Sequence, residues 1–111
     1  MKHRKLGDSG LFLSALSYGS WETFQTKFDV PRAKELMALA YEDGVNFFDN
    51  AEIYAKGKSE TLMGSALKKI GWGRDTYCVS SKVFWGGDLP TQKGLSAKHV
   101  TDACHAALRR L

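Results

Sequence analysis

The sequence predicts an α/β fold in which strands and helices alternate and the strands lie parallel in one sheet. Short apolar runs that end in polar residues alternate with longer segments whose apolar residues recur at helical spacing. A helix between two such strands makes a βαβ unit, and its right-handed crossover places the two strands parallel. Gly44 and Gly71 follow the first two helical segments, where a glycine commonly ends a helix.

A hairpin is predicted ahead of the first of these units. Residues 4–6 and 11–13 form two short runs on either side of Gly7-Asp8-Ser9-Gly10, a strong turn signal. Because the hairpin precedes the repeating units, it could be a lid or plug on the sheet. An ordinary edge hairpin explains the sequence equally well.

Three segments are predicted strands, and two of them lead into ionisable residues. They are residues 15–18, 45–49 and 77–82. The second ends at Asp49, with Tyr54 in the following loop, and the third ends at Lys82. In α/β barrels the reacting groups lie at the C-terminal ends of the strands. We therefore expect these three side chains to meet at one end of the sheet.

Three helices are predicted, each with a capping side chain at its start. Asp29, Ser59 and Ser96 are the expected N-caps. The third helix runs to the last residue and is expected to bury an apolar side that carries Cys104. Ahead of it, residues 83–95 form a long loop rich in glycine and aromatic residues, and such loops in compact domains are usually functional.

Three βα units make only part of a sheet, because parallel sheets need both faces covered and open edges are sticky. We expect residues 1–111 to form one partial domain that continues beyond Leu111 towards an eight-stranded barrel. Association with another subunit and a small open sandwich are the alternatives.

Composition limits the functional classes. The chain has 111 residues, 43% hydrophobic and 25% charged, which is ordinary for a globular domain. Its net charge of +4 comes from scattered Lys and Arg residues, so nucleic-acid binding is not expected. Cys78 and Cys104 suggest small core residues rather than a disulfide framework, and no metal-ligand spacing is present. Without a signal-peptide core or a membrane-length apolar run, we expect a cytoplasmic protein that is not inserted into a membrane.

A phenol, a carboxylate and an ammonium at one strand edge suit proton transfer. An ammonium beside a phenol favours the phenolate, and a carboxylate keeps the ammonium charged and oriented. Such a tyrosine could protonate a developing alkoxide. From spacing alone, however, a structural Asp49–Lys82 ion pair with Tyr54 as a loop aromatic is the better-supported alternative. Trp21, at the end of the first strand, is either a pocket wall or a core aromatic, and burial frequencies favour the core.

Three segments carry a resemblance to a known family. Residues 16–21, 48–54 and 80–87 resemble the aldo-keto reductase family, most closely the branch that includes voltage-gated potassium-channel β-subunits and their bacterial relatives. Residues 57–60 and 94–99 are also similar to that branch. The likeness covers essentially the whole chain but only the N-terminal third of a typical member. It implies a (β/α)8 TIM barrel and NADPH-dependent reduction of aldehydes or ketones.

The resemblance also implies roles for individual residues. Tyr54 resembles the family's proton donor, Lys82 the lysine that makes this tyrosine more acidic, and Asp49 the carboxylate that pairs with the lysine. Ser20, which replaces the usual Thr, and Trp21 resemble residues that line the nicotinamide together with Asp49. Lys27 stands where channel-subunit relatives carry a Gln, and we do not count it as a ligand.

Three hypotheses about function follow from the resemblance. The first is an NADPH-dependent reductase of small carbonyl compounds. The second is a regulatory NADPH-binding module like the channel β-subunits, with a homo-oligomer or a channel-like membrane protein as its partner. The third is an inactive truncated fragment, because the family's fourth polar site residue, a His or Asn, and the loops that hold the adenosine phosphate lie beyond residue 111. The sequence does not identify the substrate.

Overall fold

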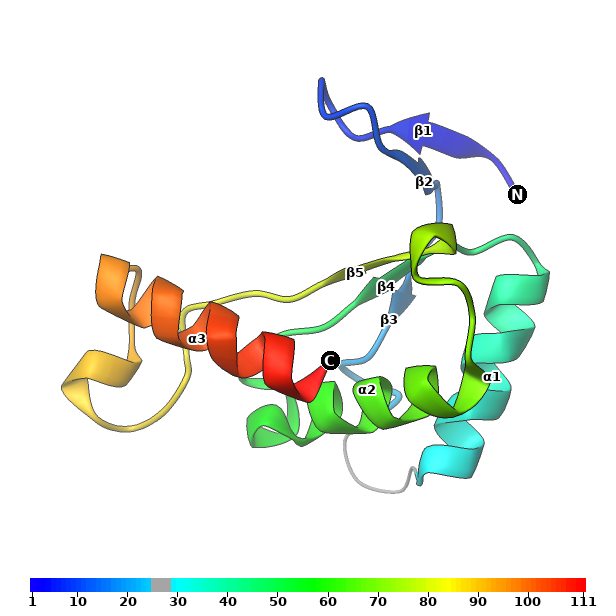
Figure 1. Ribbon diagram of the computed structural model, residues 1–111. Coiled ribbons are helices and arrows are strands. Elements are labelled where there is room, and N and C mark those ends of the chain that lie inside the picture. The colour runs from blue at the N-terminus through cyan, green and yellow to red at the C-terminus, as the bar shows by residue number, and fades with distance from the viewer. Residues whose placement is uncertain (25–28) are drawn as a thin grey trace.

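The computed structural model describes residues 1–24 and 29–111, so Lys27 lies outside the described residues. A two-stranded antiparallel hairpin is followed by a three-stranded sheet with three α-helices (Figure 1). The strands are β1 (His3–Lys5), β2 (Phe12–Ser14), β3 (Tyr18–Gly19), β4 (Phe47–Asp49) and β5 (Cys78–Ser80). The α-helices are α1 (Val30–Glu42), α2 (Lys58–Ile70) and α3 (Ala97–Arg110), and short 3₁₀ helices are η1 (Tyr54–Gly57), η2 (Arg74–Thr76) and η3 (Pro90–Gln92).

The three-stranded sheet is parallel, in the order β3-β4-β5, which confirms the α/β prediction. Asp49 lies opposite Gly19 on one side and Ser80 on the other, so all three strands end at the same edge. The first strand is shorter than predicted, since residues 15–17 are not part of it. The Ser14 hydroxyl donates a hydrogen bond to the Leu16 carbonyl at 2.6 Å, and the chain bends there as it leaves the hairpin.

The predicted hairpin is present, with Arg4 paired opposite Leu13. It is joined to the start of β4, because the Ser14 amide donates to Asn46 Oδ1 at 2.7 Å and Asn46 Nδ2 donates to the Phe12 carbonyl at 3.0 Å. Asn46 precedes β4, so the hairpin lies at the N-terminal end of the sheet (Figure 1). The expected site lies at the other end, and the hairpin is therefore not a lid over it.

Two of the three predicted helix caps are confirmed. Asp29 Oδ1 accepts a hydrogen bond from the Arg32 amide at 3.0 Å, and Ser96 Oγ accepts one from the His99 amide at 3.1 Å. The prediction for Ser59 is wrong. Helix α2 begins two residues earlier than a Ser59 cap predicts, at Lys58. Its N-cap is Gly57, whose φ of 83° lies in the left-handed region that glycine adopts at low cost. Ser59 therefore lies inside the first turn of the helix.

The core forms where α1 and α2 pack together against the sheet. Its members are buried hydrophobic side chains from these elements and from the turn after β3: Phe24, Ala33, Met37, Phe48, Met63, Ala66 and Leu67. Phe48, in the central strand, is fully buried. At the N-terminal side of the sheet, Tyr41 stacks on Trp72 at 4.0 Å between ring centroids and extends this core. Among the described residues, no helix has both the length and the apolar character needed to cross a membrane.

Helix α3 buries less than its sequence predicts. Only His99 and Ala103 are buried on it, while Leu108 is 73% exposed and Cys104, expected in the core, is also exposed. The apolar side of α3 borders an open groove of about 440 Å³ along β5. The periodicity correctly identified an apolar helix face, but nothing in the described chain covers it. Both cysteines are free.

Candidate active site

An ion pair joins the ends of two neighbouring strands. Lys82 Nζ lies 2.7 Å from Asp49 Oδ2, and it also donates to the Asn50 carbonyl at 2.7 Å. Asp49 is the last residue of β4, and Lys82 follows β5 by two residues. Because these parallel strands pair with Asp49 opposite Ser80, their C-terminal ends bring the carboxylate and the ammonium together.

A serine fixes the other oxygen of the same carboxylate. Ser80 Oγ donates a hydrogen bond to Asp49 Oδ1 at 2.6 Å. Hydrogen bonds on both oxygens hold the carboxylate plane in one orientation, with Oδ2 facing Lys82. The sequence analysis did not identify Ser80 as a site residue. Its position opposite Asp49 in the sheet is what makes this bond possible.

Tyr54 completes the group. Lys82 Nζ lies 4.8 Å from the centroid of the Tyr54 ring, and the ring of Trp21 meets Tyr54 edge-on at a centroid distance of 4.7 Å. Directly after Tyr54, Ala55 and Lys56 have φ values of 49° and 54°, in a left-handed region that side chains other than glycine rarely adopt. This tight turn keeps Tyr54 at the sheet edge. The structure thus brings together Asp49, Tyr54 and Lys82.

These contacts change the acidity of the lysine. Partial burial lowers the pKa of Lys82, but hydrogen bonds and charge interactions with Asp49 and Tyr54 outweigh burial and raise that pKa above its ordinary value. Lys82 therefore stays a cation through the neutral range. An ammonium beside a phenol stabilises the phenolate that remains when the phenol gives up its proton.

A cavity of about 320 Å³ opens beside this group. Tyr54 and Lys82 line one part of it, and the other lining residues are Ala51, Glu52, Ile53, Val83, Phe84 and Trp85. Phe84 and Trp85 come from the glycine-rich loop after β5, and their ring centroids are 4.5 Å apart. An apolar wall facing a phenol and an ammonium is the arrangement expected of a small-molecule site.

The two other residues singled out for cofactor binding lie next to Asp49 but differ in exposure. Ser20 is fully buried, and its hydroxyl donates to the Asp49 carbonyl at 2.9 Å. Trp21 is 46% exposed, so the prediction that favoured a core aromatic is wrong. Its indole packs against the Tyr54 ring, and nearly half of the residue is open to solvent because it lies beyond the end of β3.

Sequence reasoning missed two buried polar clusters behind this edge. Glu60 is fully buried; one of its oxygens accepts from Ser81 Oγ at 2.5 Å and the other from Arg110 Nε at 2.6 Å. Glu52 Oε1 lies 3.0 Å from His99 Nε2, and both side chains are 6% exposed. The partners are 21 to 50 residues apart in sequence, so no local pattern points to them. In the described parts of the chain, no group of three or more His, Cys, Asp or Glu side chains could hold a metal ion.

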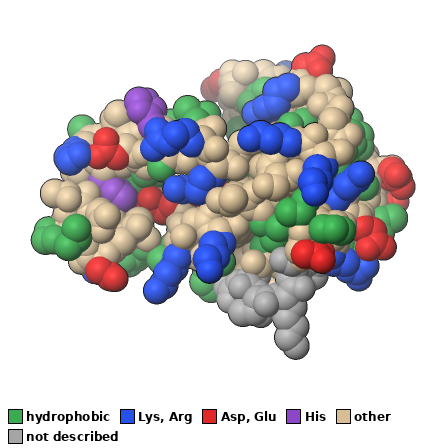
Figure 2. Space-filling view, turned by 60° about the horizontal axis from the view of Figure 1, so that its bottom comes forward, with side chains coloured by type: hydrophobic (Ala, Val, Ile, Leu, Met, Phe, Trp, Pro, Cys, Tyr) green, Lys and Arg blue, Asp and Glu red, His purple; other side chains and the backbone are tan. Residues whose placement is uncertain are grey.

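The basic residues do not form a single patch. Figure 2 shows Lys and Arg side chains spread over one face, with acidic side chains around and among them. Several are already paired with acids, including Lys98 with Asp102 and Arg32 with Glu35. The distribution gives no support to a nucleic-acid interface.

The three parallel strands and their helices match the N-terminal portion of a (β/α)8 barrel. The family model described as "Aldo/keto reductase family" matches residues 15–111. The chain therefore belongs to the aldo/keto reductase family.

Its relatives agree with this placement. Proteins named "Probable voltage-gated potassium channel subunit beta" from Arabidopsis thaliana and from Oryza sativa subsp. japonica are 48% and 50% identical to it over all 111 residues. The chain spans about a third, 34%, of the length of these relatives. A solved structure described as "Putative aldo-keto reductase from Pseudomona aeruginosa" superposes with a TM-score of 0.81 at 34% identity, over 98% of this chain and 41% of that one.

Proposed function

We propose that the whole protein to which this chain corresponds reduces aldehydes or ketones with NADPH, and that Tyr54 is the proton donor. The observation that carries the proposal is the placement of Lys82 Nζ, which is ion-paired with Asp49 at 2.7 Å and lies 4.8 Å from the centroid of the Tyr54 ring. Membership in the aldo/keto reductase family supports an oxidoreductase.

The strand ends fit the nicotinamide part of such a cofactor. Trp21 presents a half-exposed aromatic surface, and the Asp49 side chain is 30% exposed, so both are accessible beside Tyr54. Ser20 would act from behind, because its hydroxyl holds the Asp49 carbonyl rather than facing outward. When bound, NADPH would supply a hydride to the carbonyl carbon.

The chain's own residues would handle the proton. A carbonyl compound in the cavity beside Tyr54 becomes an alkoxide on reduction, and the Tyr54 hydroxyl donates its proton to that oxygen. Lys82 stabilises the phenolate left behind, and Asp49, held by Ser80, keeps the ammonium charged and in place. Phe84 and Trp85 would form the apolar side of the cavity against which the substrate packs.

Removing the phenolic hydroxyl tests the proposal. The Tyr54→Phe substitution is made in the chain and in a chimaera where the chain replaces the matching third of the Arabidopsis relative. We expect the chimaera to lose carbonyl reduction by at least ~100-fold while still binding NADPH. Tyr41→Phe, on a ring that stacks on Trp72 away from the site, is the matched control. Full turnover by the Tyr54→Phe chimaera would show that the proton donor is another group.

A second candidate function rests on the names of the relatives. Two proteins named as potassium-channel β subunits share 48% and 50% identity with the whole chain, so a regulatory NADPH-binding role at a channel is the alternative. A pull-down of the chimaera with a channel's cytoplasmic domain, run beside an aldehyde turnover assay, separates the two roles. Capture without turnover favours regulation, and turnover without capture favours the reductase.

The third hypothesis, an inactive fragment, is tested on the 111 residues themselves. We expect no tight NADPH binding by the chain alone, because the site residues found in it serve only the nicotinamide end of the cofactor. Isothermal titration of the chain with NADPH measures this directly. Saturable binding in the low micromolar range would reject the fragment hypothesis.

A further inference from the structure

We propose that Glu52 and His99 form a buried clamp that positions the loop carrying Phe84 and Trp85, and thereby sets which carbonyl compounds fit beside Tyr54. The positional part of this proposal stands on the structure alone, and the part concerning substrates rests on the proposed reductase function. Neither side chain contacts the reacting group, so both are positioning residues.

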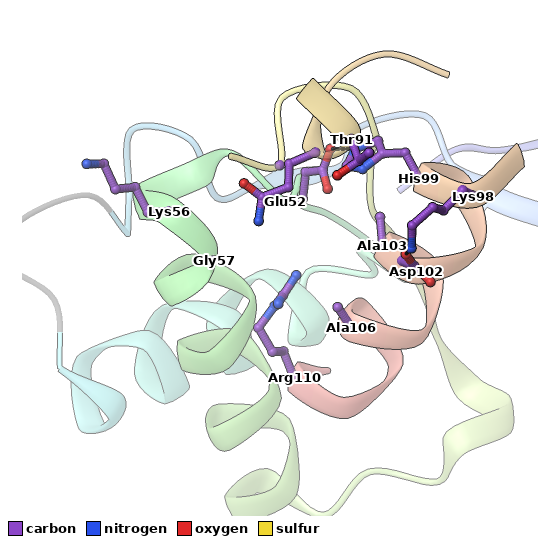
Figure 3. Close-up of a pocket in the computed structure, with 12 residues that line it drawn as sticks. Glu52, Lys56, Gly57, Thr91, Lys98, His99, Asp102, Ala103, Ala106 and Arg110 are labelled. Carbon is purple, nitrogen blue, oxygen red and sulfur yellow. Dashed lines mark hydrogen bonds and ion pairs between the residues drawn. The ribbon is translucent and has the colours of Figure 1, made fainter. Parts of the chain in front are cut away.

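The clamp joins three separate segments of the chain. Glu52 follows β4, His99 lies in the first turn of α3, and Glu52 Oε1 bonds to His99 Nε2 at 3.0 Å. The same oxygen accepts the Phe84 amide at 2.6 Å, which ties in the loop after β5. Glu52 and His99 line a cavity of about 340 Å³. Figure 3 shows them at its wall, with Lys98 and Asp102 nearby on α3 and the Lys56 amine pointing away.

The loop is built to fit around this pair. A Cβ at Gly86 would lie 2.6 Å from His99 Cε1 and 2.8 Å from Glu52 Oε2, so a residue with a side chain would push against both. Gly86 has no left-handed φ, so the constraint at this position is one of space rather than backbone strain. Its amide donates to the Gln92 carbonyl at 3.0 Å, which closes the loop on itself.

The aromatic wall depends on this anchoring because burial does not hold it. Phe84 is 40% exposed and Trp85 is 56% exposed, so few neighbours restrain their rings. Within the loop, the Phe84 carbonyl accepts from the Gly94 amide at 2.9 Å and Trp85 pairs with Lys93. The loop is joined to the end of β4 by the hydrogen bond from the Phe84 amide to Glu52, two residues before Tyr54. A carboxylate with 6% exposure accepts strong hydrogen bonds, since water does not compete for it. Loss of the clamp would therefore move the wall relative to Tyr54 without altering the Asp49–Lys82 pair.

The position of the wall is measured on the 111-residue chain labelled with 5-fluorotryptophan. The three tryptophans, Trp21, Trp72 and Trp85, give three fluorine NMR signals, and Trp72 in the core reports on overall packing. We expect His99→Phe and Gly86→Ala to shift or broaden the Trp85 signal and leave Trp72 unchanged. His99→Gln, which keeps a donor for Glu52, should restore the wild-type spectrum. His105→Phe, on an exposed histidine of the same helix, is the matched control.

The outcomes separate the two parts of the proposal. An unmoved Trp85 signal in both variants would refute the clamp. Equal changes in the Trp72 signal would also refute it, because they would show that the Glu52–His99 pair supports packing in general. In the chimaera, His99→Phe should change the ratio of kcat/KM for benzaldehyde to that for propanal by roughly tenfold, with the Asp49–Lys82 pair intact. An unchanged ratio would overturn the role in substrate choice. No turnover even by the unaltered chimaera would instead refute the reductase function, while the fluorine spectra still decide the clamp.

Discussion

The Glu60–Arg110 pair provides a direct test of how α3 is held to the rest of the molecule. Glu60 is fully buried near the start of α2, and Arg110, at the end of α3, reaches it with Nε 2.6 Å from Oε2. The Arg110 side chain is 30% exposed. The two partners therefore differ in their access to water. Removing Arg110 should lower the free energy of unfolding by a different amount from removing Glu60.

Arg110→Ala should be strongly destabilising. It leaves a carboxylate with no exposed surface and, among the residues that the structure describes, only the Ser81 hydroxyl as a side-chain partner. Removing one partner of a buried ion pair costs about 3–5 kcal/mol. A domain of this size has a total stability of only about 5–15 kcal/mol. We therefore expect a large drop in the urea midpoint, or a chain that is partly unfolded without denaturant.

Adding Glu60→Gln to Arg110→Ala should recover part of the loss. The amide is neutral, so burying it without an arginine costs less than burying an unpaired carboxylate, and it can still accept from Ser81. The double variant should then be more stable than Arg110→Ala alone by about 1–3 kcal/mol. Urea unfolding followed by circular dichroism measures the wild-type chain and both variants. A double variant that is less stable than Arg110→Ala would refute the view that an unpaired buried charge causes the loss.

Three further changes have expected outcomes. Gly64→Ala should destabilise the fold by about 1–3 kcal/mol, because the new Cβ clashes with the Arg110 carbonyl and lies 2.9 Å from the Leu111 Cα. This cost exceeds the gain from alanine's better helix propensity. A higher thermal midpoint for the variant would contradict the prediction. Asp29→Ala should cost about 1 kcal/mol through loss of the α1 cap, with Asp29→Ser close to wild type in the same melt. Because folding raises the pKa of Lys82, its ion pair should contribute fully to stability below pH 10.5. That contribution should be lost as the pH rises through the higher pKa of the folded state. This contribution to stability should be below about 1 kcal/mol, because the Asp49–Lys82 pair is partly exposed. Lys82→Met should abolish the loss of stability at alkaline pH. If the urea midpoints at pH 8 and pH 11 differed as much in Lys82→Met as in the wild type, the prediction would be wrong.

The sequence predicted the parts of the fold that depend on neighbours in the chain. The hairpin turn, the alternation of strands and helices, and the caps at Asp29 and Ser96 all rest on signals within a few residues. Ser59 shows how such a signal fails. A serine near the start of an apolar helical pattern resembles a cap. The N-cap is instead the left-handed Gly57, so Lys58 is already the first residue of the helix.

Exposure was predicted less well because it depends on what packs against each element. The apolar spacing of α3 is present, yet Cys104 and Leu108 are exposed since the described residues place no element over that side. Trp21 was expected in the core for the general reason that tryptophan is usually well buried. Its place beyond the end of a two-residue strand overrides that tendency.

The candidate site could be predicted in part for a geometric reason. Adjacent parallel strands end together, so Asp49 and Lys82 had to be neighbours if both segments were strands. The approach of Tyr54 depends on the left-handed turn at Ala55 and Lys56, which neither residue type predicts. The partners of Glu52 could not be predicted either, because the fold alone brings His99 to it across 47 residues.

The three carboxylates near the C-terminal end of β4 differ in a way that separates chemistry from support. Glu52 and Glu60 are 6% and 0% exposed, and protein groups occupy them: His99 and the Phe84 amide for the first, Arg110 and Ser81 for the second. Both carboxylates are therefore almost closed to solvent and already engaged by groups of the protein. The Asp49 side chain is 30% exposed, and its lysine partner is 52% exposed, so this pair remains accessible beside Tyr54. This difference in exposure supports the proposed proton transfer at the Asp49–Lys82 edge, while the two buried acids hold α2, α3 and the aromatic loop around it.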